Sequence, residues 1–434
     1  MSYRSSKRRR FPRWSIALAA ILGLLLLLVA IYNLPPVEER LAWRISELRA
    51  RIKYAISPPE EAVFTPDPTL AAVVQATMAA MAPTHTPTQR APTPTPAVTP
   101  TPTVVPTPLP PSALLAGIRH EYEKWNNCGP ATLSMTLSKW GYEGDQVPIA
   151  SFVKPNPRDK NVMPYELEAF VESETDLEMV VRSGGTLELA KRFLAAGYPF
   201  MVEKGYDFPG ADKGWMGHYQ LLVGYDDEQQ RFTAYDSYTG GPNLPVSYEQ
   251  LEENWRAFNF TFLIPFPADR EEEVMALLGD YADETTSLQI AAQKASEETV
   301  SLTGRGQLFA WFNRGTSLYQ LQDYGGAAAA YDEYFRLYEL TDPELRPWRM
   351  LWYQTGPYFA YYFTGRLAEV MNLATVTLVA ANEPALEESW YWRARARADT
   401  GDTAGALEDL RTSLAWHPDF APSLALLQAL GATP

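Results

Sequence analysis

The stretch "WNNCGPATL", from Trp125 to Leu133, contains the only cysteine in the 434-residue chain. Pro130 fits the first turn of a helix, where its missing N–H costs nothing, and Gly141 lies just past the end of the helical pattern. Cys128 is therefore expected at the N-terminal edge of a helix, where free backbone N–H groups and the helix dipole stabilise a thiolate. A nucleophile needs this placement, although a lone cysteine can also be a small buried apolar residue.

The composition indicates a folded protein with an acidic body. At this length two or three domains are expected, and 46% hydrophobic residues are enough to form their cores. The net charge of the whole chain is −15. The rest of the chain is more negative than this total, because basic residues precede the first acidic one: Arg4, Lys7, Arg8, Arg9, Arg10 and Arg13. An acidic body argues against nucleic acid or an anionic membrane surface as its partner, and a single cysteine excludes an intramolecular disulfide.

A long uncharged stretch follows the basic cluster. Residues 14–37 contain no charged side chain, and the run is long enough to cross a bilayer at about 1.5 Å per helical residue. We predict a transmembrane anchor over 14–37, a basic cytoplasmic tail over 1–13, and an extracytoplasmic location for the bulk of the chain. A cleaved signal peptide is the alternative, but "IYNLPP" contains no convincing cleavage site.

Two segments separate this anchor from the first domain. In residues 38–57, apolar residues recur at helical spacing from Leu41 to Ile52, which predicts an amphipathic juxtamembrane helix that lies on the membrane or pairs with a second copy. Residues 58–112 are rich in proline and threonine, which remove backbone donors and add little apolar surface. We therefore predict a disordered linker over this second segment.

Residues 113–267 are expected to form an α+β domain. Helical patterns come first, in "CGPATLSMTLSKWG", "MPYELEAFVES" and "TLELAKRFLAAG", the last with Thr186 as its N-cap. Strand patterns rich in aromatic and β-branched residues follow, in "YPFMVEK", "HYQLLVGYD", "RFTAYDS" and "FTFLIPF". Helices followed by strands that look antiparallel indicate the α+β class.

The last part of the chain repeats itself. After a helical connector over 268–307, residues 308–434 repeat a large residue followed by residues at +4, +16 and +20. The three sets are Trp311, Gly315, Ala327 and Tyr331; Trp352, Gly356, Ala368 and Asn372; and Trp390, Ala394, Ala406 and Leu410. This spacing resembles that of the all-α tetratricopeptide (TPR) repeat, and "APSLALLQALG" predicts a terminal capping helix.

A thiol nucleophile needs a proton carrier. Only two of the four histidines, His120 and His218, fall in the predicted α+β domain. His218 opens an apolar strand directly after Gly217, which is small enough to leave one side of the imidazole open. Asp236 returns beside it across a predicted hairpin, where a carboxylate would orient the ring and stabilise imidazolium.

The segments "NNCGPATLSMTL", "GHYQLLVGYDD" and "AYDSYTG" resemble the papain-like cysteine peptidases of the bacteriocin-processing, double-glycine type. The resemblance covers roughly residues 118–267. It implies a papain-like fold in which Cys128 is the nucleophile, His218 the general base and acid, and Asp236 the orienting carboxylate. We expect no cofactor and no metal, because no grouping of histidines, cysteine and carboxylates has ligand spacing.

One position departs from that family. Its active members usually carry a glutamine five or six residues before the cysteine to hold the oxyanion, and this chain has Glu123 and Tyr122 there. An ionised Glu123 cannot donate a hydrogen bond. The amide of Asn126 or Asn127, with the Cys128 backbone N–H, could replace it, or these asparagines could cap the helix or hold the turn.

Two functions remain open at this point. The first is a membrane-anchored, extracytoplasmic thiol peptidase that cleaves a peptide or amide bond, with Trp215 and Gly217 lining the substrate groove and the TPR-like array recruiting substrate or a protein partner. Trp215 could equally be plain packing. The second function is a catalytically degenerate surface adaptor in which both domains only bind peptides or proteins.

Overall fold

The computed structural model describes residues 22–24, 35–81, 108–159, 161–207, 214–238 and 240–433. It divides into two compact units, residues 1–58 and 59–434. In the first unit, helix α2 (Pro35–Ile56) covers most of the predicted juxtamembrane segment, and its Leu48 and Ile52 are exposed. Within the described ranges, no helix combines the length and apolar character needed to cross a membrane. The predicted tail and most of the predicted anchor fall outside those ranges.

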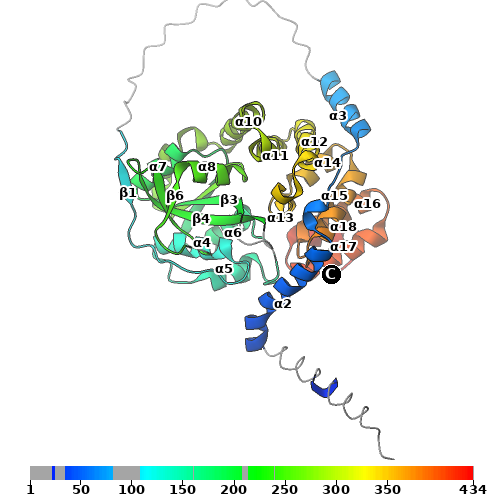
Figure 1. Ribbon diagram of the computed structural model, residues 1–434, viewed down its shortest axis with the longest axis horizontal. Coiled ribbons are helices and arrows are strands. Elements are labelled where there is room, and N and C mark those ends of the chain that lie inside the picture. Colours follow the sequence, from blue (N-terminus) through cyan, green and yellow to red (C-terminus); the bar gives the residue numbers. More distant parts are fainter. Residues whose placement is uncertain are drawn as a thin grey trace, which may run out of the picture. The chain divides into compact units, whose positions relative to one another are not determined.

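The second unit contains one antiparallel sheet (Figure 1). Its described strands run in the order β2-β7-β3-β4-β5-β6, and β1 pairs with β4. The bounds are β1 (Ser112–Leu114), β2 (Leu177–Arg182), β3 (Phe200–Asp207), β4 (Trp215–Asp226), β5 (Arg231–Tyr235), β6 (Leu244–Ser247) and β7 (Phe262–Pro267). Strand β4 is the longest of these and pairs with β3 over its first part and with β5 over its second part.

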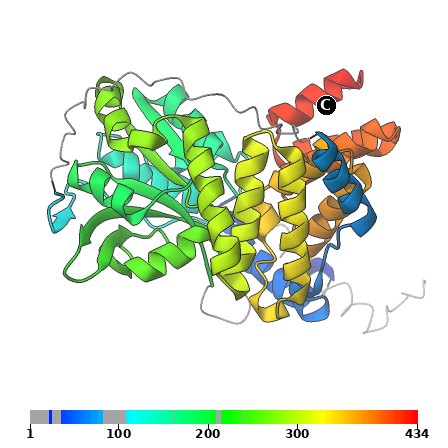
Figure 2. The same ribbon diagram turned by 90° about the horizontal axis from the view of Figure 1, so that it is seen from above.

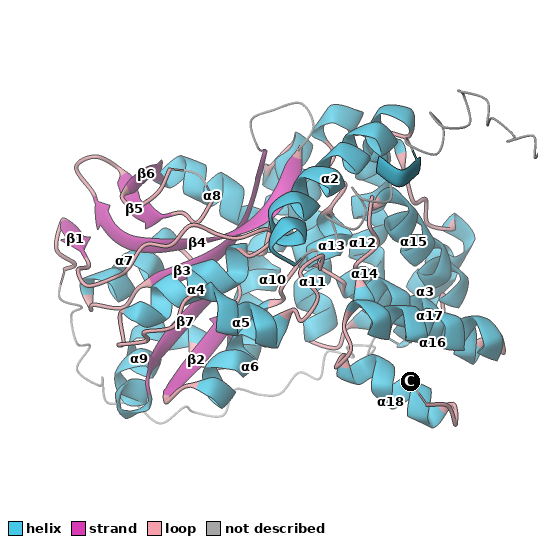
Figure 3. Ribbon diagram, turned by 90° about the horizontal axis from the view of Figure 1, so that it is seen from below, coloured by secondary structure: helices cyan, strands magenta, loops and turns pink. Residues whose placement is uncertain are grey.

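Helices cover both faces of this sheet, because side chains alternate along each strand. Helices α4 (Cys128–Ser138), α5 (Gln146–Val153) and α6 (Pro164–Glu174) pack on one face, against residues such as Leu221 of β4 (Figure 3). Helices α7 (Leu187–Ala195), α8 (Tyr248–Arg256) and α9 (Glu271–Leu278) pack on the other face, against residues such as Leu222. Each face of the sheet therefore has its own hydrophobic core.

The mixed α+β architecture and its antiparallel sheet confirm the sequence prediction. The three predicted helices are present as α4, α6 and α7, and the Thr186 side chain accepts a hydrogen bond from Leu189 N at the start of α7. The predicted strands correspond to β3, β4, β5 and β7. The sequence analysis missed β1, β2 and β6, which are short or carry acidic residues, and the helices α5 and α8.

A helical array follows the α+β domain (Figure 2). Its helices are α10 (Glu284–Ser301), α11 (Gly304–Gln320), α12 (Tyr324–Leu340), α13 (Met350–Tyr353), α14 (Gly356–Phe363), α15 (Leu367–Ala380), α16 (Glu387–Asp399), α17 (Thr403–Trp416) and α18 (Ala421–Ala429). Asp323 and Asp402 cap α12 and α17 in the same way, each accepting from a glycine N–H three residues on. A helical array after the mixed domain is therefore confirmed, whereas its TPR character remains a prediction.

The middle helical unit corrects the predicted repeat register. Ala368 and Asn372, expected at packing positions, are exposed, whereas Tyr358, Val370 and Ala374 are fully buried. These three positions have the same offsets from one another as Gly315, Ala327 and Tyr331, so the unit is shifted by two residues. The shift arises because the first helix of this unit is broken between α13 and α14, where Pro357 starts a new helix.

The first part of the predicted disordered linker is folded instead. Residues 59–61 form a 3₁₀ turn, and α3 (Pro68–Met81) follows. Phe64, between them, is 3% exposed and packs against Phe335 and Tyr361 of the array. An aromatic side chain buried in this way stabilises the segment, which the proline content of the region concealed. Residues 82–107 of the same prediction lie outside the described residues.

The α+β domain and the array share a hydrophobic core. Trp215 and Phe258 of the α+β domain stack with ring centroids 5.9 Å apart, and Tyr353 of α13 packs edge-on against both rings. Arg349 donates to the Trp215 carbonyl at 2.9 Å, and Gln354 donates to the Ala257 carbonyl at 2.9 Å. The array is therefore packed directly against the beginning of β4.

Candidate active site

Cys128 is the first residue of α4, as the sequence predicts. It is partly exposed, whereas the next nine residues of the helix are buried. A Cβ added at Gly129 would lie 3.3 Å from the ring of Tyr219 in β4, so the glycine lets the helix approach the strand closely. The start of α4 thus presents the sulfur beside β4, with the free N–H groups of the first turn around it.

His218 and Asp236 lie next to each other on neighbouring strands. His218 is in β4 and is 3% exposed, and Asp236 directly follows β5 and is 1% exposed. Nε2 of His218 is 3.3 Å from both carboxylate oxygens of Asp236. The hairpin between β4 and β5 therefore produces the contact that the sequence analysis expected.

The surroundings of His218 keep its ring protonated. Burial lowers its pKa, but hydrogen bonds with Asp236 and with the Cys128 side chain, and the negative charges of both groups, outweigh burial and raise the pKa to about 10. The imidazole is thus a cation at neutral pH. It lies between a carboxylate and the sulfur, an environment that favours a thiolate.

Three residues near His218 were not identified from the sequence. Gln220, two residues along β4, is fully buried and donates from Nε2 to Asp236 Oδ2 at 2.8 Å. The backbone N–H of Tyr238 donates to Asp236 Oδ1 at 2.9 Å, so both carboxylate oxygens are held. Lys204 is paired with His218 across β3 and β4, and burial lowers its pKa to about 8 against the opposing effect of Asp236.

The main-chain carbonyl of Asp236 also has a hydrogen-bond partner. Nε2 of His120, the second histidine of this domain, is 2.8 Å from the Asp236 carbonyl oxygen. His120 thus supports the segment after β5. Only His218 of these two histidines meets both partners of the predicted triad.

Glu123 lies beside the histidine, on the side away from Asp236. Its Oε2 accepts from Ser237 Oγ at 2.7 Å and is 4.0 Å from His218 Nδ1. Burial raises its pKa, and the nearby cationic His218 opposes that change. A carboxylate in this position stabilises imidazolium, but while ionised it offers no hydrogen to an oxyanion.

The Asn127 amide is turned away from an oxyanion role. Its Nδ2 donates to Gln146 Oε1 at 3.1 Å, and its side chain makes no capping hydrogen bond to α4. Gln146, at the start of α5, is 1% exposed and also accepts from Lys124 N. Asn127 therefore joins the turn before Cys128 to α5. Of its three expected roles, the structure favours holding the turn over capping the helix or donating to an oxyanion. Asn126 donates its amide to the Asp159 carbonyl at 3.1 Å.

Trp215 and Gly217 do not line an open groove. Trp215 is 2% exposed in the core shared with the array. A Cβ at Gly217 would lie 2.6 Å from Phe258 and 3.0 Å from Tyr353. The missing side chain at residue 217 makes room for the array rather than for substrate, and this corrects the expectation for both residues.

Comparisons with known proteins give one family match and similarity to one solved structure. Residues 116–262 match the sequence model of the Peptidase_C39 like family. This match covers most of the α+β domain and supports a C39-like, papain-like peptidase domain. Among solved structures, the chain is similar to one assigned as a C39-like peptidase from Bacillus anthracis, with 15% identity, 36% of this chain and 97% of that chain covered, and a TM-score of 0.29. None of the curated proteins matches the chain.

Proposed function

We propose that this chain is a cysteine peptidase in which Cys128, His218 and Asp236 form the catalytic triad. The Cys128 thiolate attacks the carbonyl carbon of a peptide or amide bond, and the carbon–nitrogen bond breaks as His218 gives its proton to the leaving amine. Water, deprotonated by the same imidazole, then releases the acyl group from sulfur. First-turn N–H groups of α4, including that of Cys128, stabilise the oxyanion.

The observation that carries this proposal is the buried His218–Asp236 pair at 3.3 Å, with the Cys128 side chain as the second hydrogen-bond partner of the ring. A histidine that only filled a core would not need a carboxylate held by two further donors. The family match over residues 116–262 supports the same reaction class.

The experiment uses the full-length protein and a mixture of peptides, with cleavage followed by mass spectrometry. Wild-type protein is expected to cleave a subset of the peptides. Cys128→Ala and His218→Ala should each lower the rate by about 10⁴-fold or more, as loss of a triad member does. His85→Ala, a histidine in the predicted linker, is the matched control and should cleave at the wild-type rate.

The anchor and the array have accessory roles in this proposal. The apolar run over 14–37 fixes the chain to the membrane with the peptidase domain on the extracytoplasmic side. The array presents substrate or a protein partner, as superhelical arrays of helix pairs commonly do. Alkaline extraction of membranes tests the anchor, since an integral protein stays in the pellet and a peripheral one is released.

A second candidate function rests on Glu123. An acidic side chain 4.0 Å from His218, where the related enzymes usually have glutamine, favours an adaptor that binds peptides without cleaving them. Such an adaptor would retain peptides in a pull-down from full-length protein and would show the same absence of cleavage in wild type and in Cys128→Ala. Cleavage that depends on Cys128 excludes it.

A further inference from the structure

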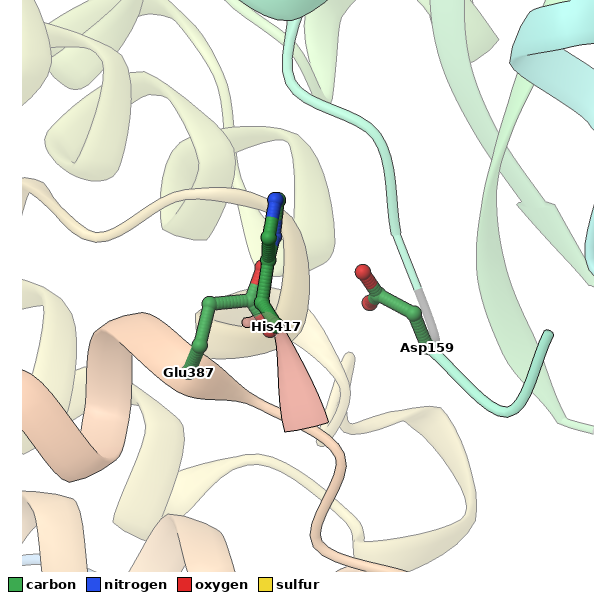
Figure 4. A group of neighbouring side chains, drawn as sticks. All are labelled: Asp159, Glu387 and His417. Carbon is green, nitrogen blue, oxygen red and sulfur yellow. The ribbon is translucent and has the colours of Figure 1, made fainter. Parts of the chain in front are cut away.

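A second buried polar cluster lies where the peptidase domain meets the array. Asp159, between α5 and α6, faces Glu387 at the start of α16 and His417 just after α17 (Figure 4). One carboxylate oxygen of each acidic residue and one ring nitrogen of His417 all lie within 4.8 Å of one another. The exposed fractions of the three residues are 3%, 3% and 8%.

Glu387 is the residue that points to a missing ligand. Its Oε1 is 3.2 Å from His417 Nδ1, whereas its Oε2 is buried and has no hydrogen-bond partner among the described residues. Burial removes the hydrogen bonds that a carboxylate oxygen makes with water, and stability is lost when no protein donor replaces them. Native structures therefore rarely contain such an oxygen. Figure 4 shows the Asp159 carboxylate directed toward Glu387 and His417 from the opposite side of the cluster.

A buried lysine adjoins this cluster. The Lys154 Nζ donates to the main-chain carbonyls of Asn126 and Asp159 at 3.0 and 3.3 Å, and neither hydrogen bond reaches the Glu387 Oε2.

We propose that Asp159, Glu387 and His417 bind a divalent transition-metal ion, with zinc the best match, at the junction of the peptidase domain and the array. Carboxylate oxygen and imidazole nitrogen together suit zinc and its first-row neighbours, whereas calcium and magnesium prefer oxygen alone. Small side-chain rotations bring three atoms at these separations to about 2.0–2.2 Å from one ion. Water completes the coordination.

This ion would be structural, because it joins the array to the segment beside the thiol. The Asp159 carbonyl accepts from Asn126, two residues before Cys128, so an ion on Asp159 also restrains the chain that leads into α4. The metal site does not depend on the proposed peptidase activity, since none of its three side chains belongs to the triad. It was not visible in the sequence, where residues 159, 387 and 417 are far apart.

The test measures zinc binding to the full-length protein after treatment with a chelator. Isothermal titration with zinc chloride is expected to give one site per chain, and zinc should raise the Tm. Glu387→Gln and His417→Gln should each weaken zinc binding by about tenfold or more, and calcium should bind at least about tenfold more weakly than zinc.

Matched controls are Glu344→Gln, an exposed glutamate in the array, and His85→Gln, which should both bind zinc as the wild type does. Asp159→Asn provides a third ligand variant if either of the first two fails to fold, as judged by circular dichroism. Zinc that binds equally to all these variants is bound elsewhere and overturns the proposal. An absence of zinc binding to the wild type, or equal affinity for calcium, overturns it as well.

Discussion

The chain contains two buried histidine–carboxylate pairs with nearly the same separation and different surroundings. His218 and Asp236 are 3.3 Å apart, and His417 and Glu387 are 3.2 Å apart. Both carboxylate oxygens of Asp236 accept hydrogen bonds from further donors, whereas Glu387 Oε2 is buried and has no hydrogen-bond partner among the described residues. We propose that these neighbours decide the chemistry of each pair: the fully held carboxylate of the first orients a catalytic ring, and the partly held carboxylate of the second leaves a position for an ion.

The strongest test of the first pair removes its carboxylate. Asp236→Ala should lower kcat/KM by about 100-fold, because the ring loses the group that orients it and stabilises its cation. The pKa of His218 should fall from about 10 toward its ordinary value, since Asp236 is the largest of the causes that raise it. Peptide cleavage and a histidine NMR titration check the two effects. Asp176→Ala, in an exposed turn, is the control, and an unchanged pKa in Asp236→Ala would contradict the assignment.

A second test addresses the hydrophobic core that the α+β domain shares with the array. Gly217→Ala should reduce the free energy of unfolding by about 2 kcal/mol, because its Cβ would lie 2.6 Å from Phe258 in a closely packed core. Denaturant unfolding measures the change. Gly306→Ala is the matched control, since a Cβ there meets only a flexible leucine end at 3.3 Å and alanine favours the helix. Equal stability of both variants would mean that the junction has free space at Gly217.

A third test changes the acidic neighbour of the first pair. Glu123→Gln should raise turnover by about tenfold at neutral pH, because an amide at this position donates to the oxyanion and an ionised carboxylate does not. Steady-state cleavage rates measure the effect, with Glu143→Gln, exposed before α5, as the control. An unaltered rate in an active enzyme would assign the oxyanion to other donors.

Much of the fold near Cys128 could be predicted from local sequence. Pro130 and Gly141 bracket a helix, and two runs rich in aromatic and β-branched residues on either side of a short turn define the β4–β5 hairpin. Once that hairpin is recognised, strand pairing alone brings His218 close to Asp236. Local patterns therefore carried both the α+β class and the candidate triad.

Contacts between distant segments were the part that sequence patterns could not supply. In the sequence, Gln220 is a single polar residue within an apolar strand. Its role is apparent only from its hydrogen bond to Asp236 in the structure. The folded segment around Phe64 and the cluster around His417 depend on tertiary packing, which has no short-range signature. The register of the middle helical unit was missed because the break before Pro357 displaces the repeat by two residues.

The most direct test of the catalytic assignment is the rate at which iodoacetamide alkylates Cys128, the single thiol of the chain, between pH 6 and pH 9. A cationic His218 with a pKa of about 10 favours the reactive thiolate form of its neighbour, so alkylation of the wild type should be fast at pH 6. In His218→Ala the rate at pH 6 should be at least about tenfold slower than in the wild type. Identical rates and pH profiles in the two proteins would contradict the assignment of Cys128 and His218 as a functional pair.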